Sequence, residues 1–363
     1  MARGRVPFLA GSPLLVLLLF SACAKVGEPQ PPTVYVAQPS QDLSCKQVSD
    51  QVILSVSIPG LNTNGTRVND LRAVEVFRIE EGLAEASGPI SKEHFLKEGI
   101  KILSVPEDEF PKYKQGNKFV FSDTLRFHED VDIYSKRRVY SVRFLNKKGQ
   151  TAGLGNQAAL VPVPIPAPPE ILSPEITQNE IRLRWVPPTE NLDGSKPARI
   201  LGYNVYRSTN LKEFPVTPIN PQLLQQPEYD DRGFEFDKDY VYAVSVVASE
   251  RNPLAESSLS KELHIIPKDT FPPNAPGNLN AVVENGVVVL LWVPPADADV
   301  DGYKVYRSDN GSTERIPLNA ELIRTFSYRD QTVQKGRTYI YAVTAIDKHN
   351  NESAAASTTV EIH

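Results

Sequence analysis

The sequence has few of the residues that usually carry chemistry. Among 363 residues there are two cysteines, one methionine, two tryptophans and five histidines. The histidines lack the short spacings of metal-ligand sets; they are His94, His128, His264, His349 and His363. No phosphate-binding glycine loop, nucleophile elbow, HExxH zinc motif or dinucleotide fingerprint occurs. We therefore predict a protein that is not an enzyme and has no catalytic residues, metal site or cofactor.

The sequence also has no marked excess of charge of either sign. The formal net charge is −5, and no basic block occurs that would attract nucleic acid or an anionic membrane surface. The apolar run Leu14–Phe20 is shorter than the ~20 residues needed to cross a bilayer. We expect no nucleic-acid partner. The remaining candidates for a ligand are a protein or a polysaccharide, and the sequence does not identify which.

The first 23 residues have the pattern of a targeting segment. Arg3 and Arg5 form a positive start, and the run Leu14–Phe20 has the length of a signal-peptide core. The run ends in Phe20-Ser-Ala-Cys23, which resembles a bacterial lipobox, with Phe20 in place of the commoner leucine. Residues 1–23 are therefore predicted as a signal peptide and Cys23 as the lipid-attachment residue. An ordinary secretory signal, with Cys23 as a plain thiol, is the alternative.

Residues 24–32 are predicted as a tether between this lipid and the folded chain. The stretch Glu28–Pro32 has nothing apolar to bury and is expected to be extended and solvated. By resemblance to other bacterial lipoproteins, Ala24 lacks the aspartate that retains some of them at the inner membrane. We expect membrane attachment through the N-terminal lipid in the cell envelope, at the outer membrane, on its periplasmic or its outer side.

The rest of the sequence contains a repeated unit. Three segments near the C-terminus recur about 100 residues earlier in the same order. The later copy consists of Trp292–Pro295, Gly302–Ser308 and Tyr339–Asp347, and the earlier copy of Trp185–Pro188, Gly202–Ser208 and Tyr240–Ala248. Apolar, aromatic and β-branched residues alternate in these segments, and turn residues separate them. This pattern predicts an all-β fold made of antiparallel sandwiches.

A looser copy precedes these two. Val56 stands where the repeat has Trp185, and Arg138 stands where it has Tyr240. A long charged connection, residues 80–117, is predicted to include a short helix near Lys92–Gly99. Proline-rich joints at residues 161–169 and 269–276 separate the three copies. They are expected to be stiff and to favour an extended rod, or else to guard edge strands.

The order Trp-x-Pro-Pro, Gly-Tyr-x-Val-Tyr-Arg, Tyr-x-Asp and Tyr-x-Tyr-x-Val-x-Ala resembles fibronectin type III domains, in particular those of bacterial surface and secreted proteins. The resemblance implies an immunoglobulin-like sandwich with the tryptophans on strand B, a Tyr pair of each copy on strand C and a tyrosine corner opening strand F. The structural core residues it implies are Trp185, Trp292, Tyr206, Tyr306, Tyr240 and Tyr339. The predicted domains are 33–165, a divergent copy, then 166–268 and 269–363.

One acidic pattern and one cysteine need separate interpretation. Asp297-Ala-Asp-Val-Asp301-Gly302 matches the opening of an EF-hand calcium loop, but Ser308 occupies the twelfth place, where the loop needs a bidentate glutamate. We interpret it as a polar loop between strands. Cys45 is expected to be a small buried hydrophobe. A Cys23–Cys45 disulfide requires that Cys23 is not lipidated, and intermolecular pairing is the remaining option.

Two functional classes follow. The first is a lipid-anchored protein whose sandwich units bind a ligand or act as spacers. The second is a periplasmic scaffold that docks onto an envelope complex through its first domain. A binder is expected to expose loop aromatics, with Phe214, Phe234 and Phe236 as candidates. A scaffold is expected to expose an apolar patch in its first domain, around Phe95, Phe110 and Tyr113.

Overall fold

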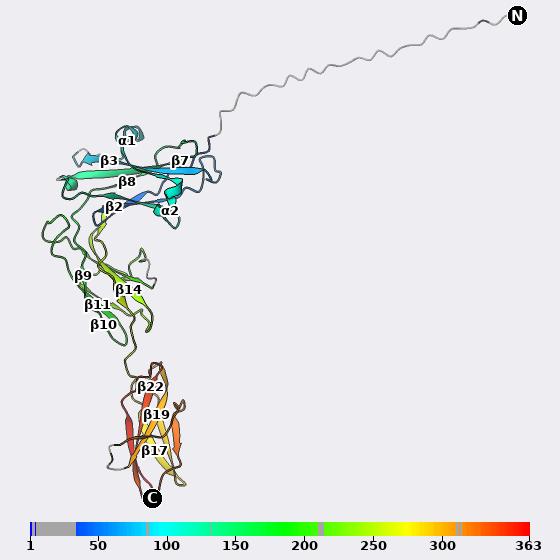
Figure 1. Ribbon diagram of the computed structural model, residues 1–363, viewed down its shortest axis with the longest axis vertical. Helices are drawn as coiled ribbons and strands as arrows, with labels where there is room; N and C mark the ends of the chain where they lie inside the picture. Colours follow the sequence, from blue (N-terminus) through cyan, green and yellow to red (C-terminus); the bar gives the residue numbers. More distant parts are fainter. Residues whose placement is uncertain are drawn as a thin grey trace.

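The computed structural model describes residues 1, 4, 34–84, 86, 88–130, 132–209, 214–309, 312 and 314–363. Cys23, the predicted tether and nearly all of the predicted signal peptide lie outside these residues. The regular secondary structure of the described chain is almost entirely β-strand, which confirms the predicted fold class. Three units, for which we keep the predicted ranges 33–165, 166–268 and 269–363, follow one another along the long axis of the molecule (Figure 1).

The first unit is a sandwich with helical additions. Its elements are β1 (Ser44–Val48), β2 (Gln51–Ser57), β3 (Leu71–Gly82), α1 (Lys92–Glu98), β4 (Ile100–Pro106), the 3-10 turn Glu107–Glu109, α2 (Phe110–Tyr113), β5 (Lys114–Gln115), β6 (Lys118–Thr124), the 3-10 turn Ile133–Ser135, β7 (Lys136–Asn146) and β8 (Gln157–Leu160). One sheet has the order β4-β3-β7-β8, and β1, β2, β6 and β5 are neighbours in the other. Apolar side chains of the two sheets pack between them.

The second unit has shorter strands. They are β9 (Glu170–Ile171), β10 (Glu175–Ile176), β11 (Ile181–Val186), β12 (Gly202–Ser208), β13 (Glu228–Asp231), β14 (Tyr240–Glu250), β15 (Leu254–Glu256) and β16 (Leu263–Ile265). β11 pairs with β9, β10 and β13 in one sheet, and β14 pairs with β12, β15 and β16 in the other. All of these pairings are antiparallel, as the alternating sequence pattern predicts.

The third unit repeats this arrangement. Its strands are β17 (Gly277–Glu284), β18 (Val287–Val293), β19 (Val300–Asp309), β20 (Ile316–Pro317), β21 (Ser327–Asp330), β22 (Thr338–Asp347) and β23 (Ala356–Glu361). The sheets have the orders β17-β18-β21 and β20-β19-β22-β23. Each of the three units therefore has its own main apolar cluster, with no residue shared among the three clusters.

The repeated Gly-Tyr motif has a steric reason. A Cβ at Gly202 would lie 2.5 Å from Leu223 Cγ and 2.6 Å from the Leu224 carbonyl oxygen, and one at Gly302 would lie 2.8 Å from Leu322 Cβ. The segment before the next strand therefore crosses directly over the start of β12 and β19. Only glycine permits this close approach.

The predicted short helix is confirmed as α1. Ser91 caps it by accepting a hydrogen bond from the backbone N–H of His94 (3.2 Å), and Gly99 follows its last residue. Phe95 on α1 is fully buried in a second apolar cluster with side chains of β3 and β7. The helix thus covers the outer face of the β4-β3-β7-β8 sheet, a face that lies away from the main core (Figure 1).

The first and second units share one continuous sheet. β1 runs parallel to β15, with Gln47 opposite Ala255 and Val48 opposite Glu256. The Gln47 side chain is completely buried and exchanges two hydrogen bonds of 2.9 Å with the backbone of Val163. Backbone and side-chain hydrogen bonds therefore both cross this junction.

The proline-rich joint 161–169 belongs to this junction. Ile165 is buried with Ala248 and Ala255, and Phe127 of the first unit packs against the same cluster. The Tyr134 hydroxyl of the first unit donates to Asp193 Oδ2 of the second at 2.5 Å. Apolar burial and side-chain hydrogen bonds therefore hold this joint against both units, and its predicted stiffness stays a prediction.

Candidate functional site

The two tryptophans lie at equivalent places in the second and third units. Trp185 on β11 and Trp292 on β18 are 3% and 4% exposed. Each indole meets a tyrosine of the facing sheet edge to face, Tyr203 at 5.2 Å and Tyr303 at 5.3 Å between ring centroids. Such pairs contribute about 0.5–1.5 kcal/mol beyond their buried area. The tryptophans therefore fix the distance between the sheets.

Tyr206 is buried, at 8% exposed, and Tyr306 is half-buried, but neither is part of the apolar clusters around the tryptophans. Successive residues of a strand point to opposite faces, so these tyrosines face away from the side that Tyr203 and Tyr303 present to the core. The Tyr206 hydroxyl donates to Glu256 at 2.8 Å, and the Tyr306 hydroxyl donates to Glu352 at 2.6 Å. These hydroxyls connect β12 to β15 in the second unit, and β19 to the segment between β22 and β23 in the third.

Tyr240 and Tyr339 open β14 and β22 and are 3% and 4% exposed. The Tyr240 hydroxyl accepts a hydrogen bond from the backbone N–H of Glu235 (3.0 Å), and the Tyr339 hydroxyl accepts one from Gln334 (3.1 Å). An arginine lies over each ring, Arg207 at 5.3 Å and Arg307 at 4.8 Å from the centroid. The tyrosine corner thus ties the preceding loop to the strand and also packs against a cation.

Each unit contains an arginine–aspartate–tyrosine triad that the sequence analysis missed. The carboxylate at the end of one strand accepts from an arginine and from a tyrosine hydroxyl on the facing sheet, at 2.6–2.8 Å. The triads are Arg78–Asp123–Tyr140, Arg207–Asp231–Tyr242 and Arg307–Asp330–Tyr341. The signal available in the sequence was that the arginine of Val-Tyr-Arg and the aspartate of Tyr-x-Asp recur together, as expected of partners in a buried ion pair.

The pKa directions of the third triad agree with a bound carboxylate. Burial alone would raise the pKa of Asp330, but hydrogen bonds from Thr332, Tyr341 and Arg307 lower it below its ordinary value. Burial, and then the bond to Asp330, raise the pKa of Tyr341 far above its ordinary value. The aspartate is therefore ionised and the tyrosine neutral at physiological pH, and both sheets are held by a charged hydrogen-bond network.

The three aspartates of the calcium-like sequence have different partners. Asp297 accepts hydrogen bonds from Asn274, and Asp301 forms an ion pair with Arg324. Asp299 shares neither of these partners. Asp297 and Asp299 lie in the polar loop between β18 and β19, and Asp301 is the second residue of β19. They do not converge on a common point, so the loop is not an EF-hand.

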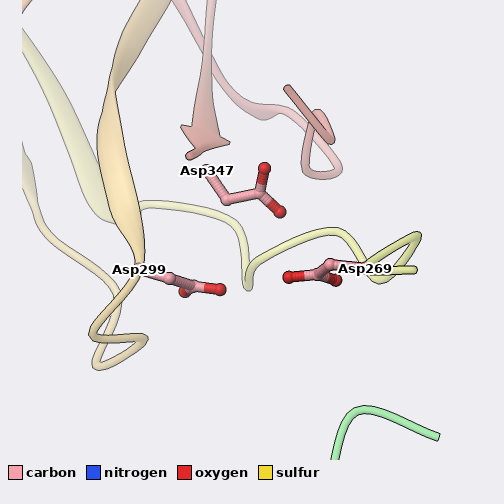
Figure 2. Close-up of side chains that lie close together, drawn as sticks. All are labelled: Asp269, Asp299 and Asp347. Carbon is pink, nitrogen blue, oxygen red and sulfur yellow. The ribbon is translucent and has the colours of Figure 1, made fainter. Parts of the chain in front are cut away.

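Asp299 instead meets two other carboxylates at the junction of the second and third units. Figure 2 shows Asp299, Asp269 of the joint and Asp347 at the end of β22 directed toward a common space, and one oxygen of each lies within 4.8 Å of the others. Oxygen donors of this kind are those that Ca²⁺ prefers. Asp347 already accepts from the backbone N–H groups of His349 and Asn351, both at 2.8 Å. Asp269 accepts from the backbone of Phe271.

His349 connects this acidic group to the second unit. Its Nδ1 lies 3.0 Å from Asp269 and its Nε2 lies 3.2 Å from Asp237. Lys268 is 2.5 Å from Asp237, and its hydrogen bond is the main reason that the pKa of Asp237 is lowered. The His349 ring also packs near Phe236, at 6.2 Å between centroids. This junction is held by a few side-chain contacts and has no shared strand among the described residues.

We expect His349→Ala to loosen this junction without unfolding either unit. Loss of the imidazole removes the ring nitrogen that lies 3.0 Å from the Asp269 carboxylate, whose side chain is 3% exposed. Hydrogen exchange of residues 266–276 is expected to accelerate at least about tenfold, while the unfolding free energies of the units change by less than about 1 kcal/mol. The control is His264→Ala, because His264 pairs only with exposed Glu262. Equal exchange in both variants would contradict the assignment.

The residues predicted to form exposed patches are not exposed. Phe234 packs against the core of the second unit, Phe236 packs on Phe234 and Phe271, and Phe214 is half-buried. In the first unit Phe95 is fully buried, and Phe110 and Tyr113 pack on the core phenylalanines. Both predicted patches are therefore wrong, because the fold uses these aromatic rings for packing.

Cys45 is partly buried against the core of the first unit. Burial raises the pKa of its thiol to about 11. The thiol is therefore protonated at neutral pH and a poor nucleophile, and this agrees with the expectation of a small hydrophobic residue. Among the described residues, no helix is both long and apolar enough to cross a membrane.

No family model matches the sequence. The chain is 28% identical over 255 residues to Exoglucanase B of Cellulomonas fimi, a match covering 68% of this chain and 22% of that enzyme. It is 35% identical over 95 residues to Amylopullulanase of Thermoanaerobacterium thermosulfurigenes, covering 26% of this chain and 5% of that enzyme. The chain therefore spans only a small part of these relatives. A two-domain fibronectin type III segment of chicken tenascin is similar at 16% identity and a TM-score of 0.35, covering 54% of this chain and 98% of that one.

Proposed function

We propose that this chain is a non-catalytic, lipid-anchored protein of the cell envelope whose β-sandwich units act as binding and spacer modules. The observation that supports this most is the sheet shared by the first and second units. A continuous sheet fixes the distance and the angle between two units, whereas a flexible linker would not. A module that must hold a ligand or a neighbour at a set distance needs this property.

The relatives support a module role. Exoglucanase B and the amylopullulanase are enzymes by name, and this chain matches 22% and 5% of their lengths. A segment that recurs beside different catalytic functions is expected to serve binding or spacing rather than the reaction. By this argument the proposed ligand classes are a polysaccharide or another envelope protein.

We expect Cys23→Ser to release the protein from the membrane fraction. The prediction rests on the lipobox-like Phe20-Ser-Ala-Cys23, where only the thiol of Cys23 can accept the lipid. Fractionation of cells followed by immunoblotting measures the distribution. The control is Ser21→Ala, which keeps a small residue and the cysteine. A Cys23→Ser protein that stays with the membrane would exclude lipid anchoring through this residue.

Protease treatment of intact cells distinguishes the side on which the units lie. Loss of the third unit from intact cells would indicate a surface module and justify a ligand screen. Protection until the envelope is broken would exclude adhesion and favour a periplasmic location.

The second candidate function is a periplasmic scaffold that docks through the first unit. It is favoured by the insertion between β3 and β6, which exposes three aliphatic side chains, Leu83 (48%), Leu96 (49%) and Ile100 (62%). A photocrosslinking residue at Leu96 would capture an envelope protein in cells if this surface docks. Crosslinking from Val216 is the control, because this residue of the second unit is also aliphatic and is more exposed, at 86%.

A further inference from the structure

Arg138 occupies the place of the tyrosine corner in the first unit. Arg78 pairs with Tyr140 across β3 and β7 in the register of Arg207 with Tyr242, so Arg138 stands where the second unit has Tyr240. In the second and third units an arginine packs on a neutral ring at this place. In the first unit two guanidinium groups, those of Arg78 and Arg138, share the same corner.

Arg138 is buried but its donors are not satisfied. Its side chain is 5% exposed, and its Nε and Nη1 form no hydrogen bond. Glu80 is 3.1 Å from Nε without hydrogen-bond geometry, Asp123 is 3.9 Å from Nη1, and Asp130 is 3.7 Å from Nη2. The charge is thus balanced while N–H donors lack acceptors, an arrangement that is costly in a purely structural corner.

The same arginine lines a groove of about 580 Å³ at the open edge between the two sheets, a size typical of small-molecule sites at ~300–1,000 Å³. The lining combines three arginines and four carboxylates with two hydroxyl and two aliphatic side chains. They are Arg78, Arg126 and Arg138; Glu80, Asp123, Glu129 and Asp130; Ser122 and Thr124; and Ile102 and Leu103. The groove therefore offers donors and acceptors together, and its charged side chains sum to a formal charge of −1.

This lining selects among ligand classes. Four carboxylates repel an anion and three guanidinium groups repel a cation. A purely apolar molecule would give no acceptor to the unsatisfied N–H groups of Arg138. A hydroxyl group both donates to a carboxylate and accepts from a guanidinium, and the C–H face of a sugar ring fits beside Ile102 and Leu103. We propose that this groove binds a neutral saccharide, with Arg138 as a principal donor.

The inference assigns a ligand class to the binding role proposed above and rests on that role. It does not depend on the lipid anchor, because a soluble binding assay and cell fractionation give independent results. Failure of one leaves the other standing.

The test uses the full chain with residues outside the groove unchanged. Neutral oligosaccharides built from glucose, galactose and N-acetylglucosamine, and uronic acid oligomers as anionic probes, are titrated by NMR and calorimetry. Arg138→Tyr introduces the residue that the other units have at this place, so it is expected to fold and to weaken neutral saccharide binding about tenfold or more. Arg184→Tyr, in a different groove on the second unit, is expected to bind normally.

Ser122→Trp is the second variant, because Ser122 is exposed on the groove wall and takes no part in the ion pairs. It is expected to block binding even if Arg138→Tyr fails to fold. Three results would overturn the proposal: no neutral saccharide binds, only the anionic oligomers bind, or Ser122→Trp binds as tightly as the parent chain.

Discussion

Asp330→Asn is expected to lower the unfolding free energy of the third unit by about 3 kcal/mol, because it removes one charge of a largely buried pair. Asp330 and Arg307 have side chains 2% and 18% exposed, with 2.6 Å between their closest atoms. The variant leaves the Arg307 guanidinium facing a neutral amide and weakens the bond from Tyr341, which joins the same carboxylate at 2.8 Å. Denaturant unfolding followed by hydrogen exchange of residues 287–293 and 338–347 measures the change.

The matched control lies in the same unit. Asp309 pairs with Arg337 at 3.4 Å, and both side chains are more than half exposed. Asp309→Asn makes the same chemical change at the surface, where an ion pair contributes ~0–1 kcal/mol. If both variants lost the same stability, the triad would not be what holds the two sheets of this unit together.

The pH dependence of this prediction has a definite sign. The folded-state pKa of Asp330 is lower than its ordinary value of 3.8. Its contribution to stability is therefore fully present above the unfolded pKa and is lost as the pH falls through the folded pKa. The difference between the parent chain and Asp330→Asn is expected to be constant from pH 7 to about 5 and to narrow in stronger acid.

The sequence predicted the strands well because their signals are local. Alternation in segments such as Tyr339–Asp347 and turn residues between them depend only on neighbouring positions, and the short helix near Lys92 was predicted for the same reason. The sequence could also have predicted which face Tyr206 and Tyr306 occupy. Each stands three positions after the core tyrosine of its strand, and residues an odd number of positions apart point to opposite faces. The prediction instead followed residue type and named Tyr206 and Tyr306 as core residues.

What the sequence could not show were contacts between distant segments. β15 has three residues, and nothing in Leu254–Glu256 indicates a parallel partner in Ser44–Val48. The gathering of Asp269, Asp299 and Asp347 depends in the same way on how two units meet. The exposed patches were predicted wrongly because loop phenylalanines have a packing role that only the tertiary fold reveals. Arg138 was noticed only as a missing tyrosine, since its unsatisfied donors depend on three other segments.

Gln47→Leu is expected to destabilise the first and second units together, by about 2–3 kcal/mol. The change removes both 2.9 Å bonds to half-buried Val163 and leaves its backbone donor and acceptor without their partner, at a cost of ~1–3 kcal/mol. Because β1 pairs with β15, exchange protection is expected to fall in residues 44–48, 161–166 and 254–256 at once. Hydrogen-exchange mass spectrometry of the full chain resolves these three segments.

Gln51→Leu is the control, because Gln51 lies on the same hairpin and its amide bonds only to neighbouring polar side chains near the surface, including Thr124 at 3.1 Å. A surface change of this kind is expected to cost less than about 0.5 kcal/mol. Faster exchange confined to residues 161–166 in Gln47→Leu would mean that the joint alone connects the units. Loss of protection in β1 and β15 together would mean that the shared sheet is the connection, since both strands then depend on one buried side chain.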